Sequence, residues 1–149
     1  MENNKKKSLL TEELFHELAA SKHIEDFLER HEEDIKDIDL QSSLYELMNK
    51  RGFTIPMIIE KASISKSLAY QIFNGQRTPN RNVLLRIAII LKLNLSETQR
   101  LLRIAKKGEL YPRIQRDAAI IFCLQHNYSL IDTNELLENI GETILLKDD

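Results

Sequence analysis

The most informative part of the chain is residues 54–95, TIPMIIEKASISKSLAYQIFNGQRTPNRNVLLRIAIILKLNL. Apolar residues recur there at helical spacing in three segments, which are separated by a turn near Ser63 and by a second break at Asn74-Gly75. Ser65 precedes the second segment and is suited to cap a helix. The pattern predicts two short helices joined by a tight turn and then a longer apolar helix, which is the order of a helix-turn-helix.

The rest of the chain has the same helical periodicity. Only four glycines and three prolines occur in 149 residues, which is too few for the turns of many short strands. The fold class is therefore predicted to be all-α. Nine helices are expected, at residues 11–20, 21–34, 40–51, 55–62, 66–73, 81–93, 96–106, 112–127 and 129–140. The residues expected to cap helix starts are Thr11, Ser21, Asp39, Thr54, Ser65, Asn80, Ser96 with Gln99 in a capping box, and Ser129 with Asp132 in another.

The net charge of −2 conceals an uneven distribution of charge along the chain. Residues 44–107 hold twelve basic and three acidic side chains, a net charge of +9, whereas residues 8–43 carry −8 and residues 108–149 carry −5. Neutralisation of phosphates by Lys and Arg supplies most sequence-independent affinity for nucleic acid, so a basic middle between acidic flanks is typical of a DNA-binding module with extensions. Solvated helices of either sign would give the same distribution, and charge alone leaves that alternative open.

The segment that follows the predicted turn resembles the motif of the lambda-repressor-like family of bacterial regulators, also called XRE-type. The family pattern S-x-x-x-x-x-x-I-x-N-G-x-R-x-P-x-x-x-x-L-x-x-I-A-x-x-L is filled in register by Ser65, Ile72, Asn74, Gly75, Arg77, Pro79, Leu84, Ile87, Ala88 and Leu91. The resemblance covers about residues 40–95. The whole chain is also similar to a group of firmicute-type proteins that add a C-terminal segment LYPR-x-x-RDA, matched here at 110–113 and 116–118.

This resemblance implies an organisation and a function. It implies a helix-turn-helix DNA-binding domain at 39–95. The residues outside it are then an acidic N-terminal helical extension at 1–38 and a C-terminal helical extension at 96–149 that is a candidate for dimerisation. The implied function is that of a sequence-specific transcription regulator. Its implied partners are double-stranded DNA and a second copy of the chain, because bacterial operators are usually palindromic.

The second helix of the motif, at about 65–73, is the one that such proteins place in the DNA major groove. The residues expected to read base edges are Lys66, Ser67, Tyr70 and Gln71. Lys66 would donate to guanine, and Gln71 would bond to adenine through both amide atoms. The residues expected to contact phosphate are Thr54, Asn74, Gln76, Arg77 and Arg81. Asn74 equally fits simple helix termination beside Gly75, which permits a positive φ.

The first helix of the motif departs from the family and supplies the competing hypothesis. Ile55 stands where the family often has Gln, Ile59 where it has a small residue, and Ser63 where it has Gly. Together with Met57 and Ile58, they give this helix an apolar surface that must face another element or a partner protein. The alternative function is therefore a protein-interaction adapter that keeps the fold and has lost the DNA contacts.

Catalytic and metal-binding patterns have little support in the sequence. His16-Glu17 begins like HExxH, but Ala20 stands in the fifth position, and His23 and His31 lie among carboxylates on a predicted solvated helix. The four glycines are too scattered for a nucleotide-binding loop. We expect no enzymatic activity, no metal and no cofactor.

Cysteine usage and hydropathy indicate where the protein works. Cys123 is the only cysteine, which excludes an internal disulfide, and it lies in the apolar run AAIIFCL as a buried small residue would. No apolar stretch reaches the roughly 18 residues of a membrane span, and Lys5, Lys6 and Lys7 lead into a segment without a signal-peptide core. We expect a cytoplasmic protein with no membrane partner.

The two C-terminal helices carry more apolar surface than they can bury between themselves. We expect most of it to pack on the helix at 96–106, with Phe122 in the core. We expect the remainder, including Leu137, to be left for dimerisation.

Overall fold

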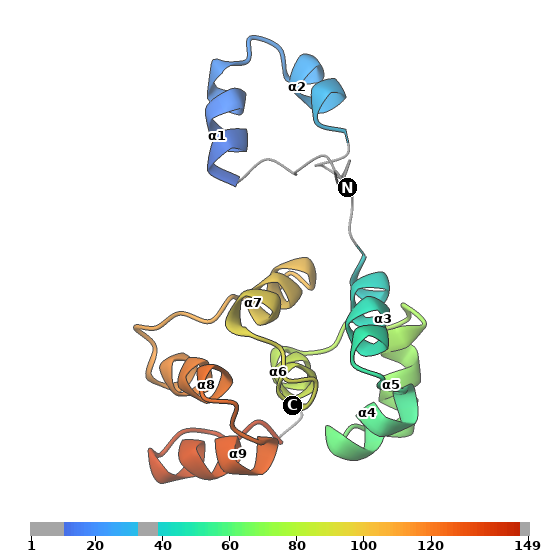
Figure 1. Cartoon of the computed structure of the whole chain (residues 1–149), viewed down its shortest axis with the longest axis vertical. Coiled ribbons are helices and arrows are strands. Elements are labelled where there is room, and N and C mark those ends of the chain that lie inside the picture. Colours follow the sequence, from blue (N-terminus) through green and yellow to red (C-terminus); the bar gives the residue numbers. More distant parts are fainter. Residues whose placement is uncertain (1–10, 33–38, 147–149) are drawn as a thin grey trace, which may run out of the picture. The chain divides into compact units, whose positions relative to one another are not determined.

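The structure, a computed structural model, describes residues 11–32 and 39–146. These residues form nine helices and no strand, which confirms the all-α class (Figure 1). The helices are α1 (Thr11–Ala20), α2 (Ile24–Arg30), α3 (Leu40–Lys50), α4 (Ile55–Lys61), α5 (Lys66–Phe73), α6 (Arg81–Ile90), α7 (Leu95–Ile104), α8 (Gln115–Gln125) and α9 (Leu130–Asn139). No described helix is both long enough and apolar enough to cross a membrane. The chain divides into two compact units, residues 1–37 and 38–149.

Most predicted helix caps are confirmed. In each case the side-chain oxygen of the cap accepts a hydrogen bond from the backbone N–H three residues later, which satisfies one of the donors that a helix start leaves unpaired. The confirmed caps are Asp39, Thr54, Ser65, Asn80 and Ser129. These local bonds explain why α3 to α6 and α9 begin where the sequence pattern placed them.

The predicted start of α7 at Ser96 is wrong. Asn94 caps the helix instead: its side chain accepts from the N–H of Glu97 at 2.8 Å, and the Glu97 carboxylate accepts from the N–H of Asn94 at 3.0 Å. Asparagine caps as well as serine does, and glutamate at the third position completes the capping box. Gln99, the predicted partner of Ser96, is therefore left to bond elsewhere.

Two other helices are shorter than predicted. α8 begins at Gln115 rather than near Pro112, because Ile114 donates its N–H to the carbonyl of Tyr111 at 3.1 Å and closes a turn there. α2 begins at Ile24 rather than at position 21, because the Ser21 hydroxyl donates to the Glu17 carbonyl at the end of α1. Positions 33–34 of the helix predicted at 21–34, and the linker expected up to residue 38, lie outside the described residues.

The N-terminal unit is a pair of short helices with a small interior. Among its described residues, Phe27 and His31 are buried, and their rings meet at a tilted angle with 4.7 Å between centroids. The His31 ring also contacts the Glu17 carboxylate, which joins α2 to α1. The large apolar side chains that remain exposed in this unit are Phe15, Leu18, Ile24 and Leu28.

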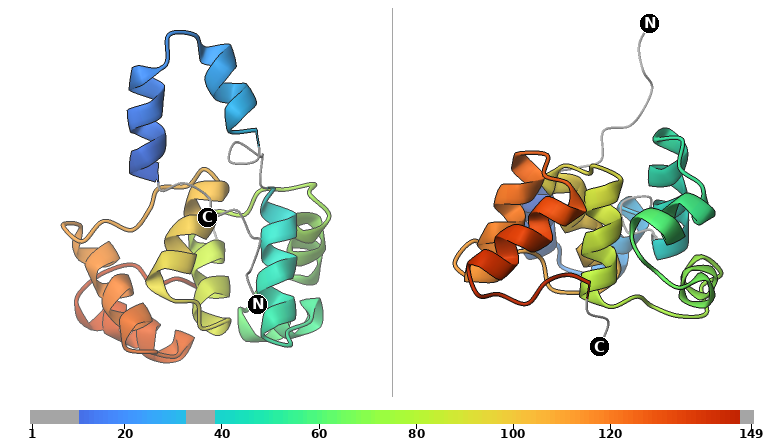
Figure 2. Two further views of the ribbon diagram at one scale, coloured as in Figure 1. Left: turned by 45° about the horizontal axis from the view of Figure 1, so that its top comes forward. Right: turned by 90° about the horizontal axis from the view of Figure 1, so that it is seen from below.

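In the second unit, α6 lies in the middle, with α3, α4 and α5 on one side and α7, α8 and α9 on the other (Figures 1 and 2). One apolar core extends from Leu40 to Leu145 and includes residues from every helix of the unit. α6 is buried nearly all round, since each of its residues from Val83 to Ile89 is buried. α8 packs on α7, as the sequence predicted, and α9 packs on α6, which it did not predict.

One of those buried residues is Arg86, whose exposed fraction is 0%. Its guanidinium donates to the carbonyls of Ala62 at 2.8 Å, Leu145 at 2.6 Å and Ser63 at 3.5 Å. The N–H of Leu145 is in turn donated to the buried Asn134 side chain at 2.7 Å. Arg86 therefore links the turn between α4 and α5 to the C-terminal segment through the centre of the unit.

The predicted roles of Phe122 and Leu137 are both wrong. Phe122 is 42% exposed and packs on the rings of His126 and Tyr128, whereas Leu137 is fully buried. α8 turns Ile120, Cys123 and Leu124 inward instead. A broad apolar stripe leaves the buried edge of a helix undefined until its neighbours are in place.

We predict that Phe122→Ala lowers the free energy of unfolding by about 1 kcal/mol, because mainly ring contacts at the surface are lost. Leu137→Ala should lower it by about 3 kcal/mol, because a cavity forms in the core. Urea titration followed by circular dichroism measures both values. Equal losses in the two variants would contradict this assignment of the core.

Candidate nucleic-acid interface

α4 and α5 are joined by a turn that requires one residue in the left-handed region. Ser63 adopts φ 53°, and the next N–H, that of Ile64, is donated back to the Ile59 carbonyl at 3.2 Å. A residue other than Gly is strained in this region, but Arg86 binds the Ser63 and Ala62 carbonyls and holds the turn in place. The direction in which α5 leaves α4 is thereby fixed.

α5 has one buried face and one polar face. Ala69, Ile72 and Phe73 are buried against the rest of the unit, and Phe73 meets the Tyr45 ring edge-on at 5.4 Å. The four predicted base-reading residues lie on the outer side: Lys66, Ser67 and Tyr70 are exposed and Gln71 is half-buried. Residues four apart share a helix face, so the pairs 66/70 and 67/71 lie side by side.

The segment after α5 is held by its own backbone. The N–H groups of Asn74, Gly75, Gln76 and Arg77 are all donated to carbonyls of α5, over distances of 2.8 to 3.2 Å. Gly75 has φ 75°, and a β-carbon there would lie 3.3 Å from the Gln41 amide. Any contact of this segment with a phosphate must therefore be made by its exposed side chains.

Lys66 and Arg77 are the basic residues of α5 and of the segment that directly follows it. In the part of the chain that the structure describes, no hydrogen bond or ion pair engages either side chain. Residues 54–95 contain six basic residues and a single acid, Glu60, but Arg86 is buried and Arg81 is paired with Asp117. The basic residues that remain at the surface are Lys61, Lys66, Arg77 and Lys92. The positive charge of this surface is thus hardly offset by nearby carboxylates of the same segment.

Thr54 is an exposed cap whose hydroxyl oxygen accepts from the Met57 N–H at 3.4 Å, so its own proton is still available to donate. No contact brings Thr54 to the residues of α5 discussed above. The apolar residues of α4 are mostly used inside the unit: Ile58 is fully buried, and Ile55 and Ile59 pack partly buried on the core.

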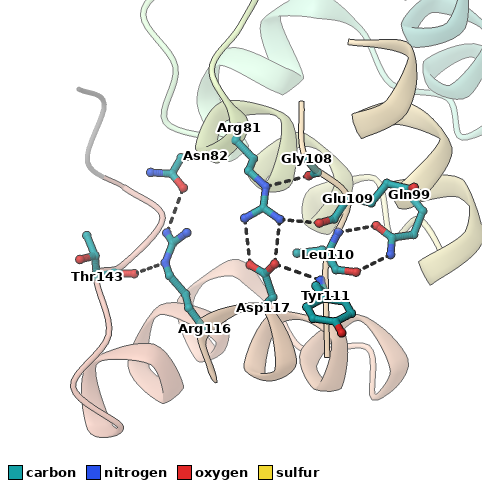
Figure 3. Close-up of polar contacts among 10 residues, drawn as sticks. All are labelled: Arg81, Asn82, Gln99, Gly108, Glu109, Leu110, Tyr111, Arg116, Asp117 and Thr143. Atoms are coloured by element: carbon teal, nitrogen blue, oxygen red, sulfur yellow. Dashed lines mark hydrogen bonds and ion pairs between the residues drawn. The ribbon is translucent and has the colours of Figure 1, made fainter. Parts of the chain in front are cut away.

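Arg81, the fifth predicted phosphate contact, is engaged inside the protein (Figure 3). Its guanidinium faces the Asp117 carboxylate with two hydrogen bonds of 2.9 and 3.0 Å. It also donates to the carbonyls of Gly108 at 2.9 Å and Glu109 at 3.0 Å. This fork-like pairing joins the start of α6 to the start of α8 and to the segment before it.

Several residues of the LYPR-x-x-RDA segment take part in these contacts or lie next to them. Leu110 is buried, and its N–H and carbonyl pair with the Gln99 side-chain amide at 2.7 and 2.8 Å. Asp117 accepts a further bond from the N–H of Tyr111 at 3.0 Å. Arg116 donates to the Asn82 side chain and to the Thr143 carbonyl, each at 2.9 Å (Figure 3).

The pKa of Asp117 lies below its ordinary value. Burial by itself would raise that pKa, but the hydrogen bonds from Arg81 and from the Tyr111 N–H, together with the positive charges of Arg81 and Arg116, outweigh it. The carboxylate is therefore ionised at neutral pH and neutralises Arg81. We refer to Arg81, Asp117 and the carbonyls of Gly108 and Glu109 as the Arg81 junction.

Sequence reasoning missed one cation of this region, Lys107. A pocket of about 130 Å³ is lined by Leu68, Arg77, Thr78, Pro79, Asn80, Val83 and Lys107. The sequence showed Lys107 only as one of twelve basic residues in the middle of the chain, because no local pattern relates it to Arg77.

Comparisons of the chain with family models, with curated proteins and with solved structures found no match. Among the described residues, no group of three or more His, Cys, Asp or Glu is placed to hold a metal ion.

We predict that Asp117→Asn lowers the free energy of unfolding at pH 7 by about 2–3 kcal/mol, because Arg81 loses its partly buried counter-charge. The folded pKa of Asp117 is depressed, so its stabilisation is complete above the unfolded pKa and is lost as the pH falls through the folded value. The gap between wild type and variant should therefore narrow below about pH 4. Urea titrations from pH 7 to pH 2.5 measure this gap.

The control is Glu135→Gln, which removes an equal charge from an exposed position in the middle of α9. It should change stability by less than about 0.5 kcal/mol at pH 7. Equal losses in the free energy of unfolding for the two variants would show that the ion pair does not hold the junction. A difference between wild type and Asp117→Asn that stays constant down to low pH would show the same.

Proposed function

We propose that the chain is a sequence-specific DNA-binding transcription regulator of the lambda-repressor-like, helix-turn-helix type, which reads the major groove with α5. The observation that carries the proposal is the polar face of α5. Lys66, Ser67, Tyr70 and Gln71 line it, while the opposite face is buried. A helix held rigidly on one side and free on the other is suited to enter a groove.

The charges around α5 support the same function. Arg77 follows the helix at a fixed position, since its N–H is bonded to the Gln71 carbonyl at 3.2 Å. In the proposal Arg77 and Gln76 contact phosphates, while Lys66 and Gln71 contact base edges. Thr54 and Asn74 remain proposed phosphate contacts, and we leave Arg81 out of the interface because Asp117 occupies its guanidinium.

The competing adapter function requires an apolar contact surface on the same motif. Within residues 54–95, all of which the structure describes, Tyr70 is the one large apolar side chain that is exposed, at 37%. The isoleucines of α4, which suggested a protein partner, are used by the core or are half-buried against it. This distribution favours DNA over an apolar protein partner.

A homodimer is part of the proposal, because a two-fold operator needs two reading helices. The C-terminal extension offers apolar side chains for this contact. Among its described residues, those exposed to solvent are Tyr111, Ile114, Phe122, Ile131, Ile140 and Leu146, and Ile131 is the most exposed of them, at 79%. Leu137 is excluded as a contact because it is buried in the core.

The DNA proposal is tested by selecting bound duplexes from random sequence and then titrating the full chain with the selected site and with random DNA. Gln71→Ala should cost about 1–3 kcal/mol on the selected site and little on random DNA, because a base contact is lost. Arg77→Gln should weaken binding to both DNAs and reduce the salt slope by about 0.9, because one phosphate contact is lost.

The matched control is Lys92→Gln, which removes the same charge just beyond the far end of α6, at an exposed position. It should leave the salt slope nearly unchanged. A folded wild-type protein that binds no duplex even near 50 mM salt would refute the DNA proposal, and the adapter would then be the better hypothesis.

We predict that Ile131→Glu weakens self-association at least tenfold in sedimentation equilibrium without lowering the free energy of unfolding of the monomer. The reason is that the side chain is exposed in the isolated chain and would be desolvated in a dimer. Asn139→Glu adds the same charge at an exposed polar position of α9 and serves as the control. A wild-type chain that stays monomeric at high micromolar concentration without DNA would contradict the dimer.

A further inference from the structure

We infer that Lys107 and Arg77 together bind one phosphate of the DNA backbone in the pocket between α5, the start of α6 and the end of α7. We call it the Lys107 pocket, after the lining residues given above. This inference rests on the proposed function and adds to it a contact that comes from outside the segment resembling the DNA-binding family.

The pocket brings together residues that are distant in the sequence. Leu68 comes from α5, Thr78 and Pro79 from the segment before α6, and Lys107 from the segment after α7. The apolar part of its lining, Leu68, Pro79 and Val83, is half-buried or buried. Lys107 is half-buried and lines the same pocket. A half-buried lysine usually packs its aliphatic stem on apolar groups and keeps its ammonium in water.

The backbone of Lys107 is fixed on both sides. Its own N–H is donated to the Leu102 carbonyl at 2.9 Å, which closes the end of α7. The next carbonyl, that of Gly108, accepts from Arg81 Nε at 2.9 Å. The Arg81 junction therefore fixes the backbone from which the Lys107 side chain projects, so that less backbone freedom is lost on binding.

The charge of the pocket calls for an anion. Two of its lining residues are cations, Arg77 and Lys107, and none is Asp or Glu. Neither cation has a hydrogen bond or ion pair among the described residues. The carboxylate bound nearby, that of Asp117, is already neutralised by Arg81. The Thr78 hydroxyl adds a neutral donor at the same place.

The position beside α5 points to a phosphate of DNA rather than to a free anion. Leu68, which lines the pocket, directly follows Ser67 on the reading helix and lies three residues before Gln71. When α5 enters the major groove, the backbone that borders the groove passes along the flank of this helix. A bound phosphate there would set the register of Gln71 on the bases.

The test compares Lys107→Gln with Lys106→Gln in the full chain. The two lysines are adjacent and carry the same charge, but Lys106 is exposed and does not line the pocket. We expect Lys107→Gln to reduce the salt slope for the selected duplex by about 0.9, and Lys106→Gln to reduce it by no more than about a third of that. Circular dichroism confirms that both variants are folded.

Equal slopes for the two variants would overturn the inference and leave DNA binding itself intact, because general charge and not the pocket would then be responsible. Inorganic phosphate separates the two sources of the anion, with the backbone amide signals of Thr78 and Lys107 followed by nuclear magnetic resonance. If phosphate saturates these signals in the low-millimolar range while Lys107→Gln keeps the wild-type slope, the pocket holds a free anion and the inference is wrong.

A wild-type chain that binds no duplex would refute the proposed function, and with it the DNA phosphate. The phosphate titration would then still decide whether the pocket binds an anion. Shifts at Thr78 that disappear in Lys107→Gln and persist in Lys106→Gln would support an anion site. If phosphate leaves the wild-type signals unchanged, the Lys107 pocket is not an anion site.

Discussion

The second unit depends on one buried guanidinium, that of Arg86. A charged group without solvent is stable only when its donors are satisfied, and Arg86 finds acceptors in the carbonyls of Ala62, Ser63 and Leu145. Those carbonyls belong to the turn between α4 and α5 and to the C-terminal segment. The turn that directs α5 and the end of the chain therefore have to be in place together, and neither can move without leaving a buried donor unpaired.

This constraint makes the C-terminal extension part of the candidate interface. The segment that resembles the family pattern ends near residue 95, but the apolar core continues through Leu110, Ile120 and Leu124 to Leu145. A polar junction at Arg81 reinforces the same connection at the start of α6. Residues 96–146 thus support α5 through the shared core with Arg86 and through the Arg81 junction. The proposed reading helix and the C-terminal extension belong to one packed unit.

Local physics was predictable from the sequence, and long-range polar contacts were not. Helical periodicity and five of the caps predicted the elements correctly, because each depends on residues within one or two turns. The roles of Arg81 and Arg86 depend on partners far along the chain, such as Asp117, 36 residues after Arg81. Spacing contains no sign of such a pair, so Arg81 was assigned to phosphate by its position in the motif alone. The side chains of Lys66, Ser67 and Tyr70 are exposed, as the sequence predicted. Their contact with DNA stays a prediction that is based on the residue types and their position on α5.

The Arg81 junction gives the LYPR-x-x-RDA segment a physical meaning. Asp117 removes Arg81 from the surface by neutralising it, which by itself would reduce the positive charge beside α5. The same guanidinium, however, binds the Gly108 and Glu109 carbonyls and so fixes the chain directly after Lys107. Arg81, which is bonded inside the protein, thus fixes the backbone beside Lys107, which is half-buried. A lysine on a fixed backbone beside Arg77 would lose less backbone freedom on contact with a phosphate than one on a mobile segment. On this argument, the carboxylate of Asp117 would support the proposed DNA contact without approaching the DNA.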